Sequence, residues 1–281
     1  MKKIIPLFMA CMAFLPLTNA GFIFSEIEIN VDEPSPIPIG KSESVDANIT
    51  LKWGAGSIIP IPLTVYVEAK DVPDWLSVTP SPSQFSVTPT GIFGGSESKN
   101  VKIVFQANKE VEAFVGYSVK LHVYTNGSFF IKGSEAIKYI YPMEDFIDKG
   151  LTIESPSAVN LYRGEEKKVY FNVTNNCNAK VVVEIEEENA TGFSFSYTKF
   201  SLLPKERKKI SVDITPDVSK EANVRIKFNY YPEGYENRKN YEEVYLTLIS
   251  RSKGGGGGAL AVGLVIIIIG AILFIIWKKK K

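Results

Sequence analysis

Apolar and polar residues alternate through most of this 281-residue chain, with almost no helical periodicity. Residues 45–53 place an apolar side chain at every odd position, and residues 63–69 repeat the pattern. Such alternation is typical of antiparallel strands that turn one face to a core and the other to water. It predicts an all-β fold. The same pattern appears in residues 101–105, 117–123, 137–141, 151–153, 169–173, 181–185, 193–197, 210–214, 224–228 and 244–248.

Turn signals separate these segments. They include the glycine-containing stretch 54–57, the proline-rich stretch 79–82, and Asn126-Gly127. An Asn-Gly pair is a strong hairpin signal because both residues tolerate a positive φ.

The alternation breaks at residues 142–150 and then restarts. This break predicts two domains, residues 21–147 and residues 148–253. The second would hold seven short strands in roughly 100 residues, the expected content of an immunoglobulin-like β-sandwich. We expect the same architecture for the slightly longer first domain. A β-solenoid is the alternative, but the sequence shows no fixed short repeat.

The C-terminal segment has the properties of a membrane anchor. Five glycines (254–258) lead into nineteen uncharged apolar residues (259–277), and four lysines (278–281) follow. As a helix, the apolar run would rise roughly 28 Å, about the thickness of a bilayer's hydrocarbon core. The lysines favour the cytoplasmic side. We therefore predict a glycine linker, one transmembrane helix through the lipid bilayer and a cytoplasmic lysine tail.

The N-terminal segment has the properties of a signal peptide. Two lysines precede an apolar run (4–17), and small residues at positions 18–20 suit cleavage after Ala20. An uncleaved anchor and a lipoprotein attached through Cys11 are the alternatives. With the anchor, a signal peptide at 1–20 predicts a single-pass type I protein of the cell membrane with an extracellular ectodomain.

Charge and cysteine content narrow the function further. The exported part carries 26 Lys and Arg against 31 Asp and Glu, so its net charge is 26 − 31 = −5. This balance argues against a nucleic-acid partner, which requires a concentrated positive surface. Removing Cys11 with the signal peptide leaves Cys177 alone, so the mature chain has no internal disulfide. Cys177 is expected to be a free thiol, with a bridge between two chains as the alternative.

Three segments resemble known surface-protein domains. Residues 161–175 look like the start of an immunoglobulin-like accessory domain common in archaeal and bacterial membrane-anchored surface proteins. Residues 200–204 with 210–216 are similar to the second half of such a domain, and residues 72–78 to a segment of the same proteins. The resemblance implies a structural, adhesive or accessory role and no catalytic residues. The layout also resembles Gram-positive surface proteins that hold other wall proteins.

Residues with catalytic or metal-binding chemistry are few. His122, the single histidine, lies between inward-pointing Leu121 and Val123, so it is expected on the solvated face. We predict no enzyme activity, no cofactor and no metal site. Residues 184–188 could hold calcium or be a solvated strand end. Residues 205–209 could meet acidic lipid or polysaccharide or be a solvated turn.

Four N-x-[ST] motifs mark candidate glycosylation sites. By strand phase or turn position, each is expected to be exposed, as a glycan requires. The asparagines are Asn48, Asn126, Asn172 and Asn189.

A tyrosine-rich loop is the predicted binding surface. In an immunoglobulin-like second domain, the loop between the sixth and seventh strands spans residues 231–240. Tyrosine provides large, rigid, amphipathic contacts that suit recognition. Packing between the domains is the alternative role. The candidate residues are Tyr230, Tyr231, Tyr235 and Tyr241.

The sequence thus predicts a membrane-anchored cell-surface protein with a structural, adhesive or ligand-binding ectodomain. Its partner would be another surface or membrane protein, or a polysaccharide. The alternative is a non-catalytic accessory subunit of a membrane protein complex.

Overall fold

The computed structural model describes residues 21–253. This part of the chain is all-β, and its one helical element is the 3₁₀ turn η1 (Glu236–Arg238). It forms two compact units. Within the described residues, the first unit comprises 21–148 with Cys177–Ala179, and the second comprises 149–176 with 180–253.

Residues 21–253 contain no helix with the length and apolar character that crossing a membrane requires. The predicted signal peptide (1–20), glycine linker (254–258), transmembrane helix (259–277) and lysine tail (278–281) lie outside the described residues.

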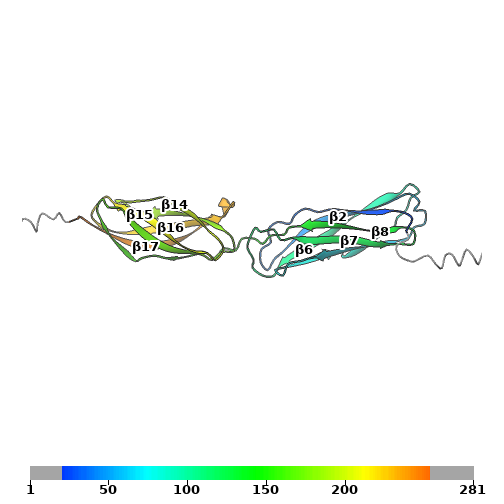
Figure 1. Cartoon of the computed structure of the whole chain (residues 1–281), viewed down its shortest axis with the longest axis horizontal. Helices are drawn as coiled ribbons and strands as arrows, with labels where there is room; N and C mark the ends of the chain where they lie inside the picture. The colour runs from blue at the N-terminus through cyan, green and yellow to red at the C-terminus, as the bar shows by residue number, and fades with distance from the viewer. Residues whose placement is uncertain (1–20, 254–281) are drawn as a thin grey trace, which may run out of the picture. The chain divides into compact units, whose positions relative to one another are not determined.

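The first unit is a two-sheet β-sandwich, with its strands running along the unit (Figure 1). One sheet has the order β1-β2-β6-β4 and the other the order β5-β3-β7-β8, and all neighbours within them are antiparallel. The strands are β1 (Ser25–Asn30), β2 (Ser42–Trp53), β3 (Leu63–Lys70), β4 (Leu76–Ser81), β5 (Gln84–Val87), β6 (Gly95–Ala107), β7 (Val119–Gly127) and β8 (Lys132–Ile140).

The core of this unit lies between its two sheets. In β2, the odd-numbered side chains Ala47, Ile49 and Leu51 are fully buried, whereas the intervening positions face outward. Residues from both sheets join them in one apolar cluster, including Phe105 of β6 and Leu121 of β7. The period of two in the sequence therefore fixes which face of each strand is buried.

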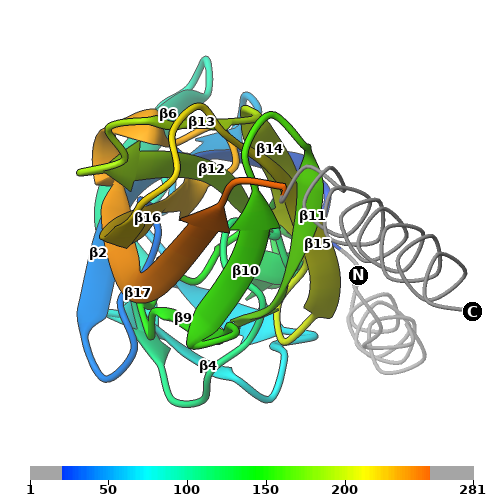
Figure 2. The same ribbon diagram turned by 90° about the vertical axis from the view of Figure 1, so that its left-hand side faces the viewer.

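The second unit is also a two-sheet β-sandwich, seen end-on in Figure 2. Its sheets have the orders β13-β15-β11-β9 and β10-β17-β16-β12-β14. All pairings within them are antiparallel except that of β10 with β17, which is parallel. The strands are β9 (Leu151–Glu154), β10 (Ala158–Tyr162), β11 (Lys167–Asn175), β12 (Val181–Glu188), β13 (Phe193–Phe195), β14 (Thr198–Leu202), β15 (Arg207–Pro216), β16 (Glu221–Pro232) and β17 (Asn240–Arg251).

An aromatic pair joins the two sheets of this unit. Phe171 of β11 and Phe228 of β16 are fully buried, and their rings meet edge-to-face with centroids 5.5 Å apart. Because β11 and β16 belong to different sheets, this contact fills the layer between them.

The two units share an unusual order of strands. In the first unit, the chain leaves β3, adds β4 to the opposite sheet, and then returns to add β5 beside β3. In the second unit, it leaves β12, adds β13 to the opposite sheet, and then returns to add β14 beside β12. The two units therefore share this excursion, and the second differs by β10, which pairs in parallel with β17 and has no counterpart in the first.

Several short strands were absent from the sequence prediction, namely β1, β4, β5, β10 and β14. The prediction of a turn at residues 79–82 was wrong in part, because residues 79–81 belong to β4 and pair with β6. Proline is tolerated there because β4 is an edge strand. Asn126 and Gly127 end β7, so the hairpin connection begins at residue 128, two residues later than expected.

Replacing Phe171 with alanine should destabilise the second unit by about 3–5 kcal/mol, because it removes a buried ring and leaves a cavity. Tyr170→Ala is the matched control, since the adjacent ring lies on the opposite face and is 50% exposed. Urea unfolding, monitored by far-ultraviolet circular dichroism, measures the stability of both variants. Equal losses for the two variants would contradict the assigned strand phase.

Candidate functional site

Four segments, far apart in the sequence, meet at one end of the first unit. They are residues 21–24, 54–61, 89–94 and 128–131, and we call them together the apolar tip. They precede β1, connect β2 to β3, connect β5 to β6 and connect β7 to β8. In Figure 1 they lie at the right-hand end of this unit.

Backbone hydrogen bonds hold the segments of the apolar tip together. The Ile23 amide donates to the Phe130 carbonyl (2.9 Å), and the Gly54 amide donates to the Phe24 carbonyl (3.1 Å). The Gly56 amide donates to the Ile92 carbonyl (3.0 Å). These bonds link each segment to another, so the tip is an ordered surface built from four connections.

Two side-chain hydrogen bonds and a close backbone approach at one glycine also join the second and third segments. The Ser57 hydroxyl donates to the Pro89 carbonyl (3.0 Å), and the Trp53 indole donates to the Thr90 carbonyl (3.1 Å). Gly94 has a φ of 91°, and a Cβ there would lie 2.5 Å from the Trp53 carbonyl oxygen. Only glycine allows this close approach of two backbones.

Large apolar side chains project from the tip into solvent. An aromatic side chain of this size has roughly 150–250 Å² of surface, and the eight Phe and Ile side chains are 37–94% exposed, so together they expose on the order of 1,000 Å². The largest apolar patch of an ordinary monomer is roughly 300–600 Å². The residues and their exposed fractions are Phe22 82%, Phe24 59%, Ile58 72%, Ile59 58%, Ile92 65%, Phe93 94%, Phe129 55% and Phe130 37%.

A shallow apolar pocket of about 250 Å³ lies among these segments. Its walls include Ile58, Ile59 and Ile61 on one side and Phe130 and Ile131 on the other. The four segments contain no Asp, Glu, Lys, Arg or His, although charged residues make up 22% of the chain. The tip therefore exposes large apolar side chains and contains no charged residue.

Sequence reasoning did not identify this surface. A usable signal was present, because three connections each carry a pair of large apolar residues in an uncharged stretch with glycine: Ile58-Ile59, Ile92-Phe93 and Phe129-Phe130. Connections on a protein surface are usually polar. A pair of large apolar residues in such a connection therefore indicates that it is covered or binds a partner.

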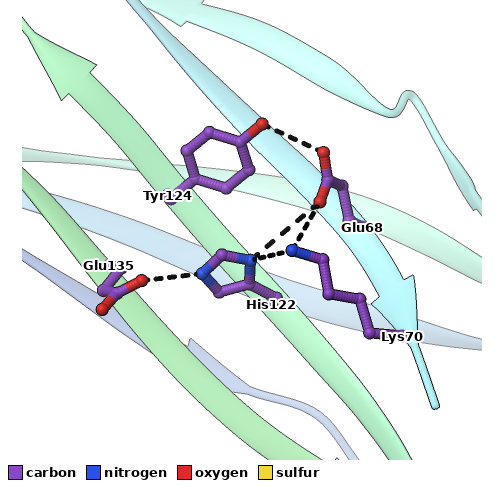
Figure 3. Close-up of polar contacts among 5 residues, drawn as sticks. All are labelled: Glu68, Lys70, His122, Tyr124 and Glu135. Carbon is purple, nitrogen blue, oxygen red and sulfur yellow. Dashed lines mark hydrogen bonds and ion pairs between the residues drawn. The ribbon is translucent and has the colours of Figure 1, made fainter.

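His122 lies on the outer face of β7, as its strand phase predicts, but its side chain is only 13% exposed (Figure 3). Lys70 Nζ lies 3.0 Å from Nδ1, and Glu135 Oε2 lies 2.9 Å from Nε2. Because an ammonium group only donates, Nδ1 accepts from Lys70, and the protonated Nε2 donates a hydrogen bond to Glu135. The ring also stacks on Tyr124, which stacks on Tyr66. His122 is thus part of a polar network covering the sheet.

Glu68 is the second centre of this network. Its carboxylate accepts a hydrogen bond from the Tyr124 hydroxyl (3.0 Å) and pairs with Lys70 (3.1 Å). The hydrogen bonds from Lys70 and Tyr124 lower the pKa of Glu68 below its usual value. The same contact with Glu68 raises the pKa of Tyr124. Within residues 21–253, no group of three His, Cys, Asp or Glu side chains is arranged to hold a metal ion.

The predicted binding-loop tyrosines are not all on a surface. Tyr230 and Tyr231 lie in β16 and are 1% and 5% exposed. Tyr231 donates to Glu184 (3.1 Å) and accepts from Lys199 (3.2 Å), which fixes its ring within the unit. The connection itself spans residues 233–239, with Tyr235 half-buried and Tyr241 exposed at the start of β17.

The acidic stretch 184–188 is engaged with basic side chains. Glu184 pairs with Lys199 (2.9 Å) and Lys239 (3.5 Å), and Lys199 lowers the pKa of Glu184. Glu188 pairs with Arg225 and Lys227. These carboxylates therefore serve ion pairs between neighbouring strands.

The four sequon asparagines differ in the state of their side-chain nitrogen, which is the atom that a glycan modifies. Asn48 Nδ2 donates to Asn100 (2.8 Å) on the outer face of β2 and β6, and Asn172 Nδ2 donates to Glu154 (3.2 Å). Asn126 is exposed near the end of β7 rather than in the turn. Asn189 is exposed in the turn after β12, with a φ of 63°.

Cys177 is fully buried and forms no disulfide within the described residues. Its thiol lies 3.6 Å from Asp148 Oδ1, within the first unit. Next to it, the Asn178 amide donates to the carbonyls of Val111 (3.2 Å) and Asp145 (3.1 Å). A bridge between two chains through Cys177 would require this segment to open.

No family model matches the chain, and no curated protein matches it. Among solved structures, a PapD-like domain of human CEP192 is similar at 12% identity, covering 36% of this chain and 85% of that one, with a TM-score of 0.31. The C. elegans MSP family member WR4 is similar at 15% identity, covering 36% and 97%, with a TM-score of 0.28. The YadV chaperone is similar at 13% identity, covering 78% and 99%, with a TM-score of 0.26. With scores this low, none of these likenesses bears on what the chain does.

The Glu68 network should make the stability of the first unit depend on pH in the acidic range. Because the folded pKa of Glu68 is lowered, its stabilising effect is present above the unfolded pKa, about 4.3, and is lost as pH falls through the folded pKa. Glu68→Gln should therefore be less stable than the unsubstituted chain at pH 7, and this deficit should be smaller at pH 3. Thermal unfolding at both pH values measures this.

Glu43→Gln, on β2 of the same unit, is the control for general charge effects. An equal deficit of Glu68→Gln at both pH values would show that the carboxylate charge is not responsible.

Proposed function

We propose that the chain is a non-catalytic, single-pass cell-surface protein whose exported part binds its partner through the apolar tip. The observation that supports this most directly is the eight exposed apolar side chains gathered there. The tip offers no acid, base or activated nucleophile. Its hydroxyls at Ser57 and Ser128 are used in holding the loops, as donor to Pro89 and acceptor from Ile131.

We also propose that both units are immunoglobulin-like. In the first, β1-β2-β6-β4 corresponds to the A-B-E-D sheet of an immunoglobulin domain and β3-β7-β8 to C-F-G. In the second, β9-β11-β15-β13 corresponds to A-B-E-D and β12-β16-β17 to C-F-G. Folds of this kind present binding surfaces on the connections at their ends, and the apolar tip is such an end.

Membrane attachment is supported by the sequence of the two ends. The apolar run 259–277 with its lysine tail favours an anchor, and residues 1–20 favour export. A polysaccharide partner fits the tip poorly, because sugars present many hydroxyls and the large exposed side chains of the tip, all Phe or Ile, offer them no hydrogen-bonding groups. The accessory-subunit alternative remains compatible with an apolar tip, because subunit interfaces are more apolar than other protein surfaces.

Protease added to intact cells should release a fragment of the exported part and leave the lysine tail protected. A tag after Lys281 reports the protected end by immunoblot. Cleavage that occurs only after lysis would reverse the proposed orientation.

The double substitution Ile58→Ser with Phe93→Ser should abolish partner binding, because it removes two of the most exposed apolar side chains of the tip. Ile137→Ser with Tyr139→Ser is the matched control, since these residues are 46% and 50% exposed on β8. Binding is measured by crosslinking on intact cells, followed by purification after mild detergent extraction. A stoichiometric membrane protein lost only in the tip variant favours the subunit role. Crosslinks that are unchanged in the tip variant would contradict binding through the tip.

A further inference from the structure

We propose that the partner of the apolar tip is a lipid bilayer, and that the tip inserts its projecting side chains into the outer part of the membrane. This rests on the proposed binding role of the tip and names the class of partner. Four properties of the tip support a bilayer over an apolar protein surface.

The first property is that many backbone amides of the tip have partners within the tip. Inserted backbone groups need internal partners because the hydrocarbon region offers none. Beyond the three bonds between segments described above, the Gly91 amide donates to the Ser57 carbonyl (2.9 Å) and the Ile58 amide to the Gly56 carbonyl (2.9 Å). The Ser128 amide donates to the Ile131 carbonyl (2.7 Å). Each of the three long connections thus carries paired backbone groups where it would meet lipid.

The second property is the shape of the tip. Phe93, Phe22 and Ile58 are the most exposed of its side chains, at 94%, 82% and 72%, so they project rather than line a deep groove. Projecting apolar side chains on a folded support can enter the headgroup and acyl boundary to a depth of about 5–10 Å. A bilayer adapts to such a surface, whereas a protein partner would need a matching cavity.

The third property is composition. Protein interfaces concentrate binding energy in Trp, Tyr and Arg and carry about one hydrogen bond per 100–200 Å². The four segments contain no Trp, Tyr or Arg, and their large exposed apolar residues are all Phe or Ile. Hydrocarbon demands apolar bulk without hydrogen-bonding groups, and the tip supplies this.

The fourth property is the charge of the strands behind the tip. The strands behind the tip carry charges of both signs, including the Lys52–Glu28 ion pair and exposed Lys132. We therefore expect attachment to depend on apolar insertion and to change little with anionic lipid.

The test places an environment-sensitive NBD fluorophore on the tip of the full chain. Phe93→Cys is labelled, and Ile137→Cys on β8 is the matched control; the unsubstituted chain, in which Cys177 is buried, corrects for labelling of native thiols. The labelled chain is reconstituted into phosphatidylcholine nanodiscs and mixed with phosphatidylcholine vesicles. A nitroxide on the lipid acyl chain is placed either in the nanodiscs or in the vesicles.

We expect the fluorescence at position 93 to fall by about half with nitroxide in one of the two bilayers, because the probe then lies at the acyl boundary. Fluorescence at position 137 should stay unchanged. Replacing a fraction of the lipid with phosphatidylserine should alter the result little.

No quenching at position 93 from either bilayer would overturn the inference. If crosslinking to a protein still depends on Ile58 and Phe93 in that case, the tip binds a protein, and the proposed function stands without the bilayer. If neither quenching nor tip-dependent crosslinking occurs, both proposals are wrong. Equal quenching at positions 93 and 137 would show nonspecific adsorption and would also overturn the inference.

Discussion

Each unit depends on apolar side chains from two sheets packing into one layer, because no disulfide within the described chain supports it. In the second unit, the Phe171–Phe228 contact joins the sheets at a fully buried position. In the first, Ile49, Phe105 and Leu121 contribute to one cluster from three strands and two sheets. Burying such side chains contributes about 1.5–3 kcal/mol each. This burial holds the strands rigidly enough to support the connections at their ends.

The outer faces of the sheets follow a different rule from the apolar tip. On β3 and β7, the outward-facing positions carry Glu68, Lys70, His122 and Tyr124, which satisfy one another by hydrogen bonds, ion pairs and stacking. At the tip, exposed positions carry Phe and Ile that nothing in the described unit covers. Natural sequences break local patterning rules mainly where function requires it. The contrast within one unit therefore supports the proposal that the tip binds a partner.

The strand prediction succeeded where one face is buried and failed where pairing alone defines a strand. Long strands such as β2 and β16 show several alternations, so their phase was evident. In contrast, β4 contains Pro80, and β5 is four residues long with three polar or half-buried positions. β4 forms by pairing with β6, and β5 forms by pairing with β3. The local sequence of an edge strand does not show whether a distant strand has backbone groups available for it.

The tyrosine loop shows a second limit. Expectation placed Tyr231 in a connection, but β16 extends through Pro232, and Tyr231 is buried beside Glu184 and Lys199. The length of a strand depends on how far its neighbour pairs with it, and here β12 pairs with β16 as far as Pro232. That register is a property of two strands together.

By itself, the sequence determined that residues 21–253 are all-β and which side of each long strand is buried, because alternation acts over neighbouring residues. The connections at residues 54–61, 89–94 and 128–131 each carry an apolar pair without charge, but sequence reasoning did not single these pairs out. Only the tertiary structure decided that these connections meet. Ile23 bonds to Phe130 across more than a hundred residues, and Gly56 bonds to Ile92 across more than thirty. Which ends of the strands lie together follows from sheet order and strand direction, and these are settled by packing between distant segments.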